Sequence, residues 1–482
     1  MRIDVDMSAL VAQHRFTGIA SDSREVRPGY LFAAIPGAKA NGAVFIADAA
    51  SRGAIAVLGA PEIADIAREY GMVFYPAANP RLALAHLAAA FFAAQPATVA
   101  AVTGTNGKTS VTVFLRHIWT ALGKSAASLG TIGALSPAGE IKLSNTTPGP
   151  VELHQLLARL AGEGVSHLAM EASSHGLDQA RLDGVKIQAA GFTNLTRDHL
   201  DYHPSFEAYR DAKCRLFSEL VGDGGVAVIN ADADYADAFI AASEARKLEL
   251  LTVGEKGLAL QLVGRTPHGD GQELTLRFGG QDYRVNLPLA GGFQASNALV
   301  AAGLAIGLGE DPSAVFAALE SVKGAPGRLE KMAVSRAGAP IYVDYAHTPD
   351  ALEVVLKALR PHTRAKLVVV FGCGGDRDKG KRPLMGKAAI TFADKVIVTD
   401  DNPRSEEAAA IRQDALAGCP GAIEIGDRAE AIRSAVAALG AGDVLVIAGK
   451  GHEAGQIIKG VVHPFSDREE ALAAALATGG HA

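Results

Sequence analysis

One short turn carries the residue types that bind phosphate groups. It combines glycines, hydroxyl side chains and a lysine in the order Gly104, Thr105, Asn106, Gly107, Lys108, Thr109 and Ser110. The glycines permit backbone angles that aim successive N–H groups at an anion, and a following helix N-terminus adds the positive end of its dipole. In such a loop Lys108 reaches the outer phosphates, and the Thr109 hydroxyl is placed to bind Mg²⁺. The turn therefore predicts a site for ATP and Mg²⁺.

The segments on both sides of this turn support the same interpretation. Residues 97–102 form an apolar run that predicts a buried strand, and residues 108–122 have the apolar spacing of a helix. The spacing departs from the usual G-x-x-x-x-G-K-[ST] pattern, because Val102 stands where the first glycine is expected. An ordinary glycine-rich turn is the alternative, but the order of strand, Gly-Lys-Thr and helix favours a phosphate loop.

Two further strand ends carry groups suited to a metal site. Residues 166–170 predict a strand that delivers Glu171, and residues 187–192 predict one that leads into the loop 193–203, which contains His199. Ligands of parallel sheets bind beyond the carboxyl ends of strands, so both groups belong to the edge of the phosphate loop. A buried carboxylate needs a partner, and Mg²⁺ is its natural one. A lone histidine in such a loop is more often structural.

Several polar residues of the same region have simpler explanations that the pattern leaves open. Thr146 and Thr147 precede a predicted helix at 151–160, which is compatible with helix capping as well as with ligand binding. Lys213 lies within a predicted helix at 205–220, where periodicity alone makes it an ordinary surface lysine.

Two other candidates lie outside that region. Ser21 and Ser23 belong to a polar segment before a strand, and a simple turn explains them as well as a ligand does. Asn297 follows Gln294 by three residues near the start of an alanine-rich helix, so the two share a face. Helix capping remains an alternative for Asn297.

The last third of the chain has four polar loops, each directly after a predicted strand. They contain the candidate ligand-binding residues Asp344, Tyr345, His347, Arg377, Asp401, Asn402, Pro403, Arg404, Gly449 and Glu453. Turn chemistry explains each loop singly, but four such loops at one sheet edge favour a binding site. The glycine-rich loop at 372–377 does not fit G-x-G-x-x-G, which disfavours a dinucleotide site.

The chain of 482 residues is too long for one core and predicts about three domains. Strands and helices alternate, so the fold class is α/β. We expect an N-terminal domain at 1–95, a central domain at 96–325 with a mainly parallel sheet and a small antiparallel insertion, and a doubly wound C-terminal domain at 326–482. Gly and Pro mark the linker at 323–328.

Composition excludes several classes of protein. The net charge of −6 argues against nucleic-acid binding, and three scattered cysteines argue against a disulfide framework or zinc site. The first six residues do not resemble a signal peptide, and the longest apolar stretch is interrupted by polar residues, which argues against membrane insertion. We expect a cytoplasmic monomer.

The phosphate loop, Arg328 with Glu330 at the linker, and the four C-terminal loops together resemble the Mur ligase family over essentially the whole chain. Asp401-Asn402-Pro403-Arg404 resembles the motif of its diaminopimelate-adding members. Asn41 stands where many relatives have aspartate, a small departure. The resemblance implies an ATP-dependent amide ligase of peptidoglycan synthesis, with UDP-N-acetylmuramoyl-L-alanyl-D-glutamate and meso-diaminopimelate as substrates and an acyl phosphate as intermediate.

The resemblance also implies individual roles. Catalysis and metal binding fall to Lys108, Thr109, Glu171, His199 and Lys213, the last as a CO₂-derived carbamate. ATP contacts are implied for the phosphate loop and for Asn297 near the adenine, Arg328, Asp344, Tyr345 and His347. The UDP substrate is assigned to Ser21, Ser23, Thr146, Thr147, Ser173, Gln179 and Arg181. The amino acid is assigned to Arg377, Asp401, Asn402, Pro403, Arg404, Gly449 and Glu453.

Physical chemistry agrees with the amino-acid assignment. Meso-diaminopimelate carries a distal carboxylate and ammonium where lysine has only an ammonium, and arginines offer paired donors to a carboxylate. The alternatives are a lysine-adding or folylpolyglutamate-type ligase, or an ATPase of another class that drives a partner. Phosphate release that requires both the UDP-peptide and the amino acid separates a ligase from such an ATPase.

Overall fold

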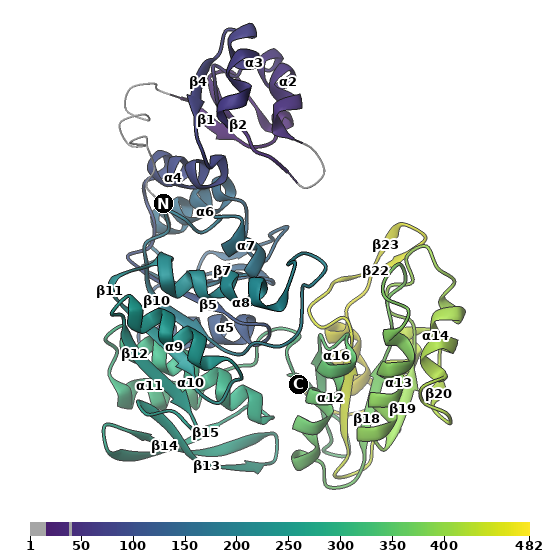
Figure 1. Ribbon diagram of the computed structural model, residues 1–482. Coiled ribbons are helices and arrows are strands. Elements are labelled where there is room, and N and C mark those ends of the chain that lie inside the picture. The colour runs from purple at the N-terminus through teal and green to yellow at the C-terminus, as the bar shows by residue number, and fades with distance from the viewer. Residues whose placement is uncertain (1–15, 38–40) are drawn as a thin grey trace. The chain divides into compact units, whose positions relative to one another are not determined.

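The computed structural model describes residues 16–37 and 41–482 (Figure 1). The first six residues, which the sequence analysis found unlike a signal peptide, lie outside the described part. The chain divides into two compact units. Unit one comprises the chain up to residue 259 together with residues 300–312, and unit two comprises residues 260–299 and 313–482.

Unit one begins with a four-stranded parallel sheet. Its strands, in spatial order, are β1 (Gly18–Ala20), β2 (Tyr30–Ala34), β3 (Ala56–Gly59) and β4 (Val73–Pro76). Alternate residues of β2 enter different cores, since Leu31 and Ala33 belong to one apolar cluster and Phe32 and Ala34 to another. Both faces are therefore covered. The covering elements are α2 (Ile46–Ser51), α3 (Ala64–Glu69), α4 (Pro80–Phe92) and 3₁₀ turns at Ser23–Glu25, Gly42–Phe45 and Pro61–Ile63.

The larger sheet of unit one has the strand order β12-β11-β10-β5-β9-β6-β7-β8. The first six of these pair in parallel, and β6, β7 and β8 pair antiparallel. The strands are β5 (Thr98–Thr103), β6 (Ala126–Gly130), β7 (Gly133–Ser136), β8 (Gly139–Ile141), β9 (His167–Glu171), β10 (Ile187–Phe192), β11 (Val221–Asn230) and β12 (Glu249–Gly254). Register places Val102 opposite Glu171 and Thr103 opposite Phe192. The predicted edge therefore forms.

Helices cover this sheet and begin or end at the residues that matter for the site. They are α5 (Lys108–Ala121), α6 (Pro150–Gly162), α7 (Ser174–Asp178), α8 (Phe206–Arg215), α9 (Ala236–Ala245) and α10 (Gly292–Gly307). The predicted single helix at 205–220 is α8 followed by one π-helical turn at Leu216–Leu220. The Ser205 hydroxyl caps α8 by accepting from the Ala208 N–H.

Unit two contains the predicted antiparallel insertion. Strands β13 (Leu260–His268), β14 (Gly271–Phe278) and β15 (Gln281–Leu287) form a meander, as the period-two pattern and glycine turns indicate. Helix α11 (Pro312–Leu319) follows in the chain, and the linker leads into the C-terminal sheet.

The C-terminal sheet has the order β16-β17-β21-β18-β19-β20, and only its edge strand β16 runs antiparallel. Its strands are β16 (Glu330–Val334), β17 (Pro340–Asp344), β18 (Leu367–Phe371), β19 (Lys395–Val398), β20 (Ile423–Glu424) and β21 (Val444–Ala448). Helices α12 (Pro349–Leu359), α13 (Lys381–Phe392), α14 (Ala408–Leu416), α15 (Arg428–Ala437) and α16 (Asp467–Ala477) pack around it, with a 3₁₀ turn at Arg360–His362. Two apolar clusters, one on each face, confirm the doubly wound architecture. A hairpin of β22 (Gly455–Ile458) and β23 (Val461–Pro464) stands apart from the main sheet.

None of the helices formed by residues 16–37 and 41–482 combines the length and apolar character that a membrane span needs.

A buried ion pair holds the strand ends of the C-terminal sheet together. Arg428 and Asp467 are both fully buried, and two N–H···O bonds of 2.7 Å join them. The same guanidinium donates to the backbone carbonyls of Ala448 at 2.9 Å and Asp400 at 3.2 Å. It therefore ties helix α16 to the carboxyl ends of β21 and β19, the strands on either side of β18.

We predict that Arg428→Met destabilises the C-terminal domain by about 3–5 kcal/mol, because the Asp467 carboxylate stays buried without its partner. Urea denaturation followed by circular dichroism measures the loss. Arg277→Met, which breaks the half-exposed pair with Asp282, is the control and is expected to cost less than about 1 kcal/mol. Equal effects of the two substitutions would contradict the role assigned to Arg428.

Candidate active site

The phosphate loop lies between β5 and α5, as the sequence predicts. Gly104 has a φ of +148°, and a Cβ on it would lie 1.9 Å from the Thr193 hydroxyl, so only glycine fits there. The Lys108 ammonium folds over the loop and donates to the carbonyls of Gly104 and Thr105 at 2.9 Å each. The loop thus places a cation directly beside its own backbone.

The segment after β10 holds the loop in place. Asn194 accepts from the Thr105 N–H through its carbonyl at 2.8 Å and from the Asn106 N–H through its side chain at 3.0 Å. The Thr193 hydroxyl donates to the Asn106 carbonyl at 2.6 Å. These bonds come from a neighbouring strand, so the loop conformation depends on the sheet and on its glycines together.

Glu171 lies beside the loop with both carboxylate oxygens engaged. Its Oε1 accepts from the Thr109 hydroxyl and the Thr131 N–H at 2.9 Å each, and Oε2 accepts from the Thr131 hydroxyl at 3.1 Å. Thr109 and Glu171 are both buried. A hydroxyl and a carboxylate oxygen at this separation form the all-oxygen donor set that Mg²⁺ prefers.

Lys213 is a buried residue, so its interpretation as a surface lysine is wrong. Only 1% of it is exposed, and its Nζ donates to the Gly104 carbonyl at 2.8 Å while lying 4.6 Å from the centre of the Tyr209 ring. Burial, with a smaller contribution from Lys108, lowers the pKa of Lys213 well below its usual value. The amine is therefore easily deprotonated, and a neutral amine is the nucleophilic form.

Tyr209, which sequence reasoning did not single out, links Lys213 to the loop. It is fully buried, and its hydroxyl lies 3.0 Å from the Thr105 hydroxyl. A tyrosine four residues before a lysine on a helix is the only signal for this contact in the sequence.

His199, another predicted metal ligand, lies in an exposed position. Its side chain is 44% exposed, and its Nε2 lies 3.7 Å from Asp198. Within the described ranges no hydrogen bond joins it to Glu171 or Lys213, and no group of three or more His, Cys, Asp or Glu side chains is arranged to hold a metal ion. Thr109 and Glu171 are the two predicted ligands in direct contact.

The predicted UDP-substrate residues form a second cluster around Thr147. Its hydroxyl donates to the Glu171 carbonyl at 3.1 Å and accepts from the Ser173 N–H and hydroxyl at 3.1 and 3.0 Å. Arg181 donates to the Thr147 carbonyl at 2.7 Å and to the Gln179 side chain at 2.8 Å. Glu171, which also accepts from Thr109, therefore connects this cluster to the phosphate loop.

The capping interpretation of the threonine pair is wrong. The N-cap of α6 is Gly149, which has no side chain to accept a bond, and Thr146 instead lies 3.1 Å from the Thr131 hydroxyl. In the N-terminal sheet, Ser21 is exposed and Ser23 is buried with its hydroxyl bonded to Asp48. Ser23 belongs to a 3₁₀ turn capped by Asp22, as the polar-turn alternative predicts.

In unit two, the residues assigned to ATP lie around the linker. The Arg328 guanidinium lies 4.5 Å from the centre of the Tyr345 ring, and the His347 Nδ1 lies 2.9 Å from the Tyr345 carbonyl. Asn297 donates to the Gln294 side chain at 3.1 Å, which itself donates to the Arg328 carbonyl at 3.0 Å. Asn297 is inside α10, so the capping alternative is wrong.

Asp344 joins the linker to the loop after β17. Its two oxygens accept from the N–H groups of Leu329 at 2.6 Å and Ala346 at 2.7 Å. Burial raises the pKa of Asp344 to about 6, against the opposing effect of Arg328. The carboxylate is charged at neutral pH and fixes both loops.

The predicted amino-acid pocket contains a network of charged groups. Lys450 is fully buried, and its Nζ lies 3.0 Å from Asn402 Oδ1, 3.2 Å from Glu453 Oε2 and 3.7 Å from Asp401 Oδ1. Asn402 also donates to Glu453 at 3.0 Å. The sequence analysis included the loop after β21 but did not single out Lys450. Its bond to Oδ1 fixes the orientation of the Asn402 amide.

Two arginines at this pocket have no carboxylate partner among the described residues. Arg404 is half-buried and donates to the Gly375 carbonyl at 2.7 Å, and Arg377 is exposed and donates to the Asp376 carbonyl at 3.2 Å. Pro403, which precedes Arg404 in the chain, and Gly449 are both buried. The guanidinium groups therefore keep donors for an anionic ligand.

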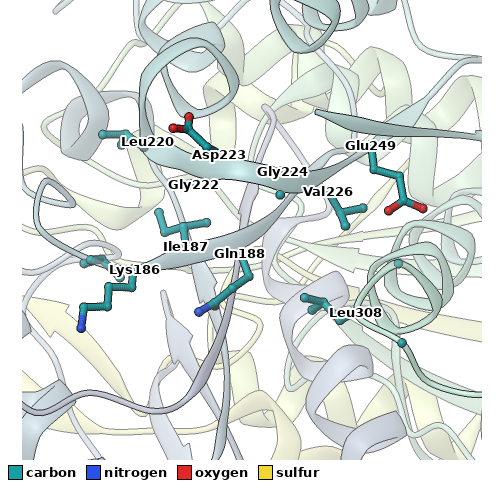
Figure 2. A pocket seen from close by; sticks show the side chains of 14 residues that line it. Lys186, Ile187, Gln188, Leu220, Gly222, Asp223, Gly224, Val226, Glu249 and Leu308 are labelled. Atoms are coloured by element: carbon teal, nitrogen blue, oxygen red, sulfur yellow. The ribbon is translucent and has the colours of Figure 1, made fainter. Parts of the chain in front are cut away.

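A cavity of about 650 Å³ lies at the opposite edge of the larger sheet of unit one (Figure 2). It is lined at the amino ends of β10 and β11 by Ile187, Gly222 and Val226, with Lys186 and Glu249 at its sides. None of its lining residues belongs to the phosphate loop.

Comparison with known proteins identifies the family. The catalytic-domain model of the Mur ligase family matches residues 15–92, the Mur ligase middle domain matches 102–305, and the Mur ligase glutamate ligase domain matches 327–451. The chain is 56% identical to the UDP-N-acetylmuramoyl-L-alanyl-D-glutamate--2,6-diaminopimelate ligase of Bradyrhizobium diazoefficiens, over 98% of each chain.

Solved structures agree. A UDP-N-acetylmuramoyl-L-alanyl-D-glutamate--2,6-diaminopimelate ligase superimposes with a TM-score of 0.73 at 35% identity, covering 99% of this chain and 97% of that one. The MurF ligase of Thermotoga maritima in complex with ADP shares the fold at 20% identity, with a TM-score of 0.60 and coverage of 90% and 94%. The chain belongs to the Mur ligase family of ATP-dependent ligases.

Proposed function

We propose that this ligase adds meso-diaminopimelate to UDP-N-acetylmuramoyl-L-alanyl-D-glutamate in peptidoglycan precursor synthesis. The relatives named for this activity support the assignment. The observation that carries it is the pair Arg404 and Arg377, which lack carboxylate partners in the described chain, on loops of which one also carries Asp401 and Asn402, the latter bonded to Glu453. A ligand with a carboxylate and an ammonium at one end complements this arrangement.

The reaction requires activation of a carboxylate, because oxide is too poor a leaving group for direct attack by an amine. A carboxylate oxygen of the D-glutamyl residue attacks the γ-phosphorus of ATP, and ADP leaves. The amine of diaminopimelate then attacks the acyl carbon, phosphate leaves, and the amine proton is lost to give the amide. Chemistry of this kind relies mainly on positioning and on charge stabilisation.

The residues of unit one suit the first step. Lys108 carries a positive charge beside the loop that cradles the phosphates and would stabilise charge on the transferring group. Thr109 and Glu171 would hold Mg²⁺, since their oxygens are adjacent and buried, and His199 would bind metal after a change in its exposed loop. Bound Mg²⁺ supplies charge neutralisation for the phosphate oxygens.

Lys213 suits modification by CO₂. Its neutral amine attacks the carbon of CO₂, a C–N bond forms, and one proton is released to give a carbamate. The carbamate would carry a negative charge and oxygen atoms that can bind a metal ion. It would lie close to the phosphate loop and to Lys108. Burial that disfavours the ammonium favours this reaction.

In unit two, Arg328 and Tyr345 present a cation over an aromatic face for the nucleotide, with Asn297, Asp344 and His347 around them. The need for ATP and a UDP-linked precursor supports a cytoplasmic location, and we expect a monomer.

The test of the function is an ATP-consumption assay with the UDP-dipeptide and a panel of diamino acids. We expect ADP release to depend on both the UDP-dipeptide and meso-diaminopimelate, because acyl phosphate forms only on the bound precursor and turns over only with the amine. Full ATP hydrolysis in the absence of either substrate would refute the proposal.

Arg404→Ala is expected to raise the KM for meso-diaminopimelate about 100-fold, since an unpaired carboxylate costs about 2–5 kcal/mol. The KM for ATP should change less than twofold. Steady-state kinetics with each substrate varied in turn measures both constants. Lys459→Ala is the control, because Lys459 is in the adjacent hairpin turn and its pair with Glu407 is exposed. Parallel rises in both KM values would argue against a role in amino-acid recognition.

Lys213→Ala is expected to be nearly inactive and to regain part of its activity with added formate or acetate, which replace the carbamate charge. In the native protein, ¹³C-labelled bicarbonate should give a carbamate signal by NMR that the variant lacks. The exposed Lys256→Ala serves as the control and should keep both the signal and the activity. A native protein that is fully active but gives no carbamate signal after treatment with ¹³C-labelled bicarbonate would refute the carbamate hypothesis.

A further inference from the structure

A group of charged side chains contacts the loop that carries Arg377, one of the two arginines of the proposed amino-acid site. Arg382, near the start of α13, is 1% exposed and donates to three acceptors. They are the Asp414 carboxylate at 2.9 Å, the Glu406 carboxylate at 2.8 Å and, at the limit of 3.4 Å, the Gly374 carbonyl. A guanidinium buried to this extent is costly without such partners, so removal of one of them is expected to disturb the others.

Glu406 connects Arg382 to the loop that carries Arg377. Its Oε1 accepts from the Asp376 N–H at 2.7 Å as well as from Arg382. Hydrogen bonding to Arg382, followed by the Asp376 N–H, lowers the pKa of Glu406 to about 2. Its Oε2 lies 3.2 Å from the Lys379 Nζ, so the carboxylate is charged at physiological pH and both of its oxygens have partners.

The loops of Arg377 and Arg404 are also bonded to each other. The Gly375 N–H donates to the Asn402 carbonyl at 2.9 Å, and Arg404 donates to the Gly375 carbonyl at 2.7 Å. The Ser405 hydroxyl donates to Asp376 at 2.5 Å. A Cβ on Gly375 would lie 2.0 Å from the Pro403 carbonyl oxygen, so the two backbones touch.

Both arginine-bearing loops contain an unfavourable backbone conformation. Asp376 has a φ of +53° and Arg404 a φ of +52°, in the left-handed region that residues with a Cβ avoid. Such conformations persist where surrounding contacts impose them. For Asp376 those contacts are Glu406 and Ser405, and for Arg404 they are the backbone bonds to β22 and to the hairpin turn, made with Ile457 and Lys459.

We propose that Arg382 and Glu406 are positioning residues that set the relative placement of the Arg377 and Arg404 guanidinium groups and thereby the preference for an amino acid with a distal carboxylate. This inference rests on the proposed function. Arg382 is buried, and Glu406 acts on the loop through the Asp376 N–H. Glu406 fixes the backbone next to Arg377, and Arg382 fixes Glu406.

Asp414 provides a matched control for a merely structural role. It also forms an ion pair with Arg382, at 2.9 Å, but it belongs to α14, and within the described chain no hydrogen bond joins its side chain to either arginine-bearing loop. Removal of Glu406 and removal of Asp414 each deprive Arg382 of one carboxylate, and only the first releases the Asp376 N–H. A difference in the kinetic constants of the two variants therefore arises from the loop that carries Arg377.

The experiment compares the native protein with Glu406→Ala, Glu406→Gln and Asp414→Ala in steady-state kinetics with meso-diaminopimelate and with lysine. Glu406→Ala is expected to raise the KM for diaminopimelate at least tenfold, with the KM for ATP within twofold. It should lower the ratio of kcat/KM for diaminopimelate over lysine at least tenfold. Glu406→Gln, which keeps an oxygen for the Asp376 N–H, should give an intermediate change of at least threefold. Asp414→Ala should stay within twofold of the native protein in all of these constants.

The ratio of the two kcat/KM values does not depend on the fraction of folded enzyme, so partial unfolding does not imitate the effect. If Glu406→Ala fails to fold, Glu406→Gln decides the question by the same ratio. An unchanged ratio in the folded Glu406 variants, or an equal change in Asp414→Ala, would overturn the inference. A native protein that does not use diaminopimelate would instead overturn the proposed function.

Discussion

The chemistry of unit one depends on the pairing of β5 with β9 on one side and β10 on the other. This register brings the phosphate loop, Glu171 and the segment at Thr193 to one edge of the sheet, although they are up to 90 residues apart in the chain. The loop then receives its hydrogen bonds from Asn194 and its adjacent carboxylate from Glu171. Without that pairing, the glycines alone would leave the loop without a fixed conformation.

The C-terminal sheet uses the same principle with different chemistry. There a fully buried guanidinium, Arg428, bonds to the carbonyls of two strand ends, and the loops after those strands carry Asp401, Asn402 and Glu453. A second buried cation, Lys450, orders the polar groups of those loops. Buried charges in this unit therefore orient the pocket, which is a role that apolar packing cannot supply.

The parts of the fold and site that follow from the sequence are those set by local pattern. The phosphate loop, the strand at 187–192 and the antiparallel insertion were predictable, because glycine spacing and period-two alternation act over a few residues. The burial of Lys213 was not, since a helix face is buried only when a distant segment covers it. The roles of Lys450 and Arg382 were hidden for a similar reason: Lys450 is bonded to Asn402, 48 residues earlier, and Arg382 is paired with Glu406 and Asp414, 24 and 32 residues later.

The contact of Gly375 with the Pro403 carbonyl constrains how this pocket can diversify. Any larger residue at Gly375 would force the two backbones apart, so the spacing between the loops is set by contact between backbones and not by adjustable side chains. Redesign toward other amino acids must therefore keep this glycine and alter the side chains that project from the loops. In a library that randomises Gly375, most variants would therefore have a misfolded pocket.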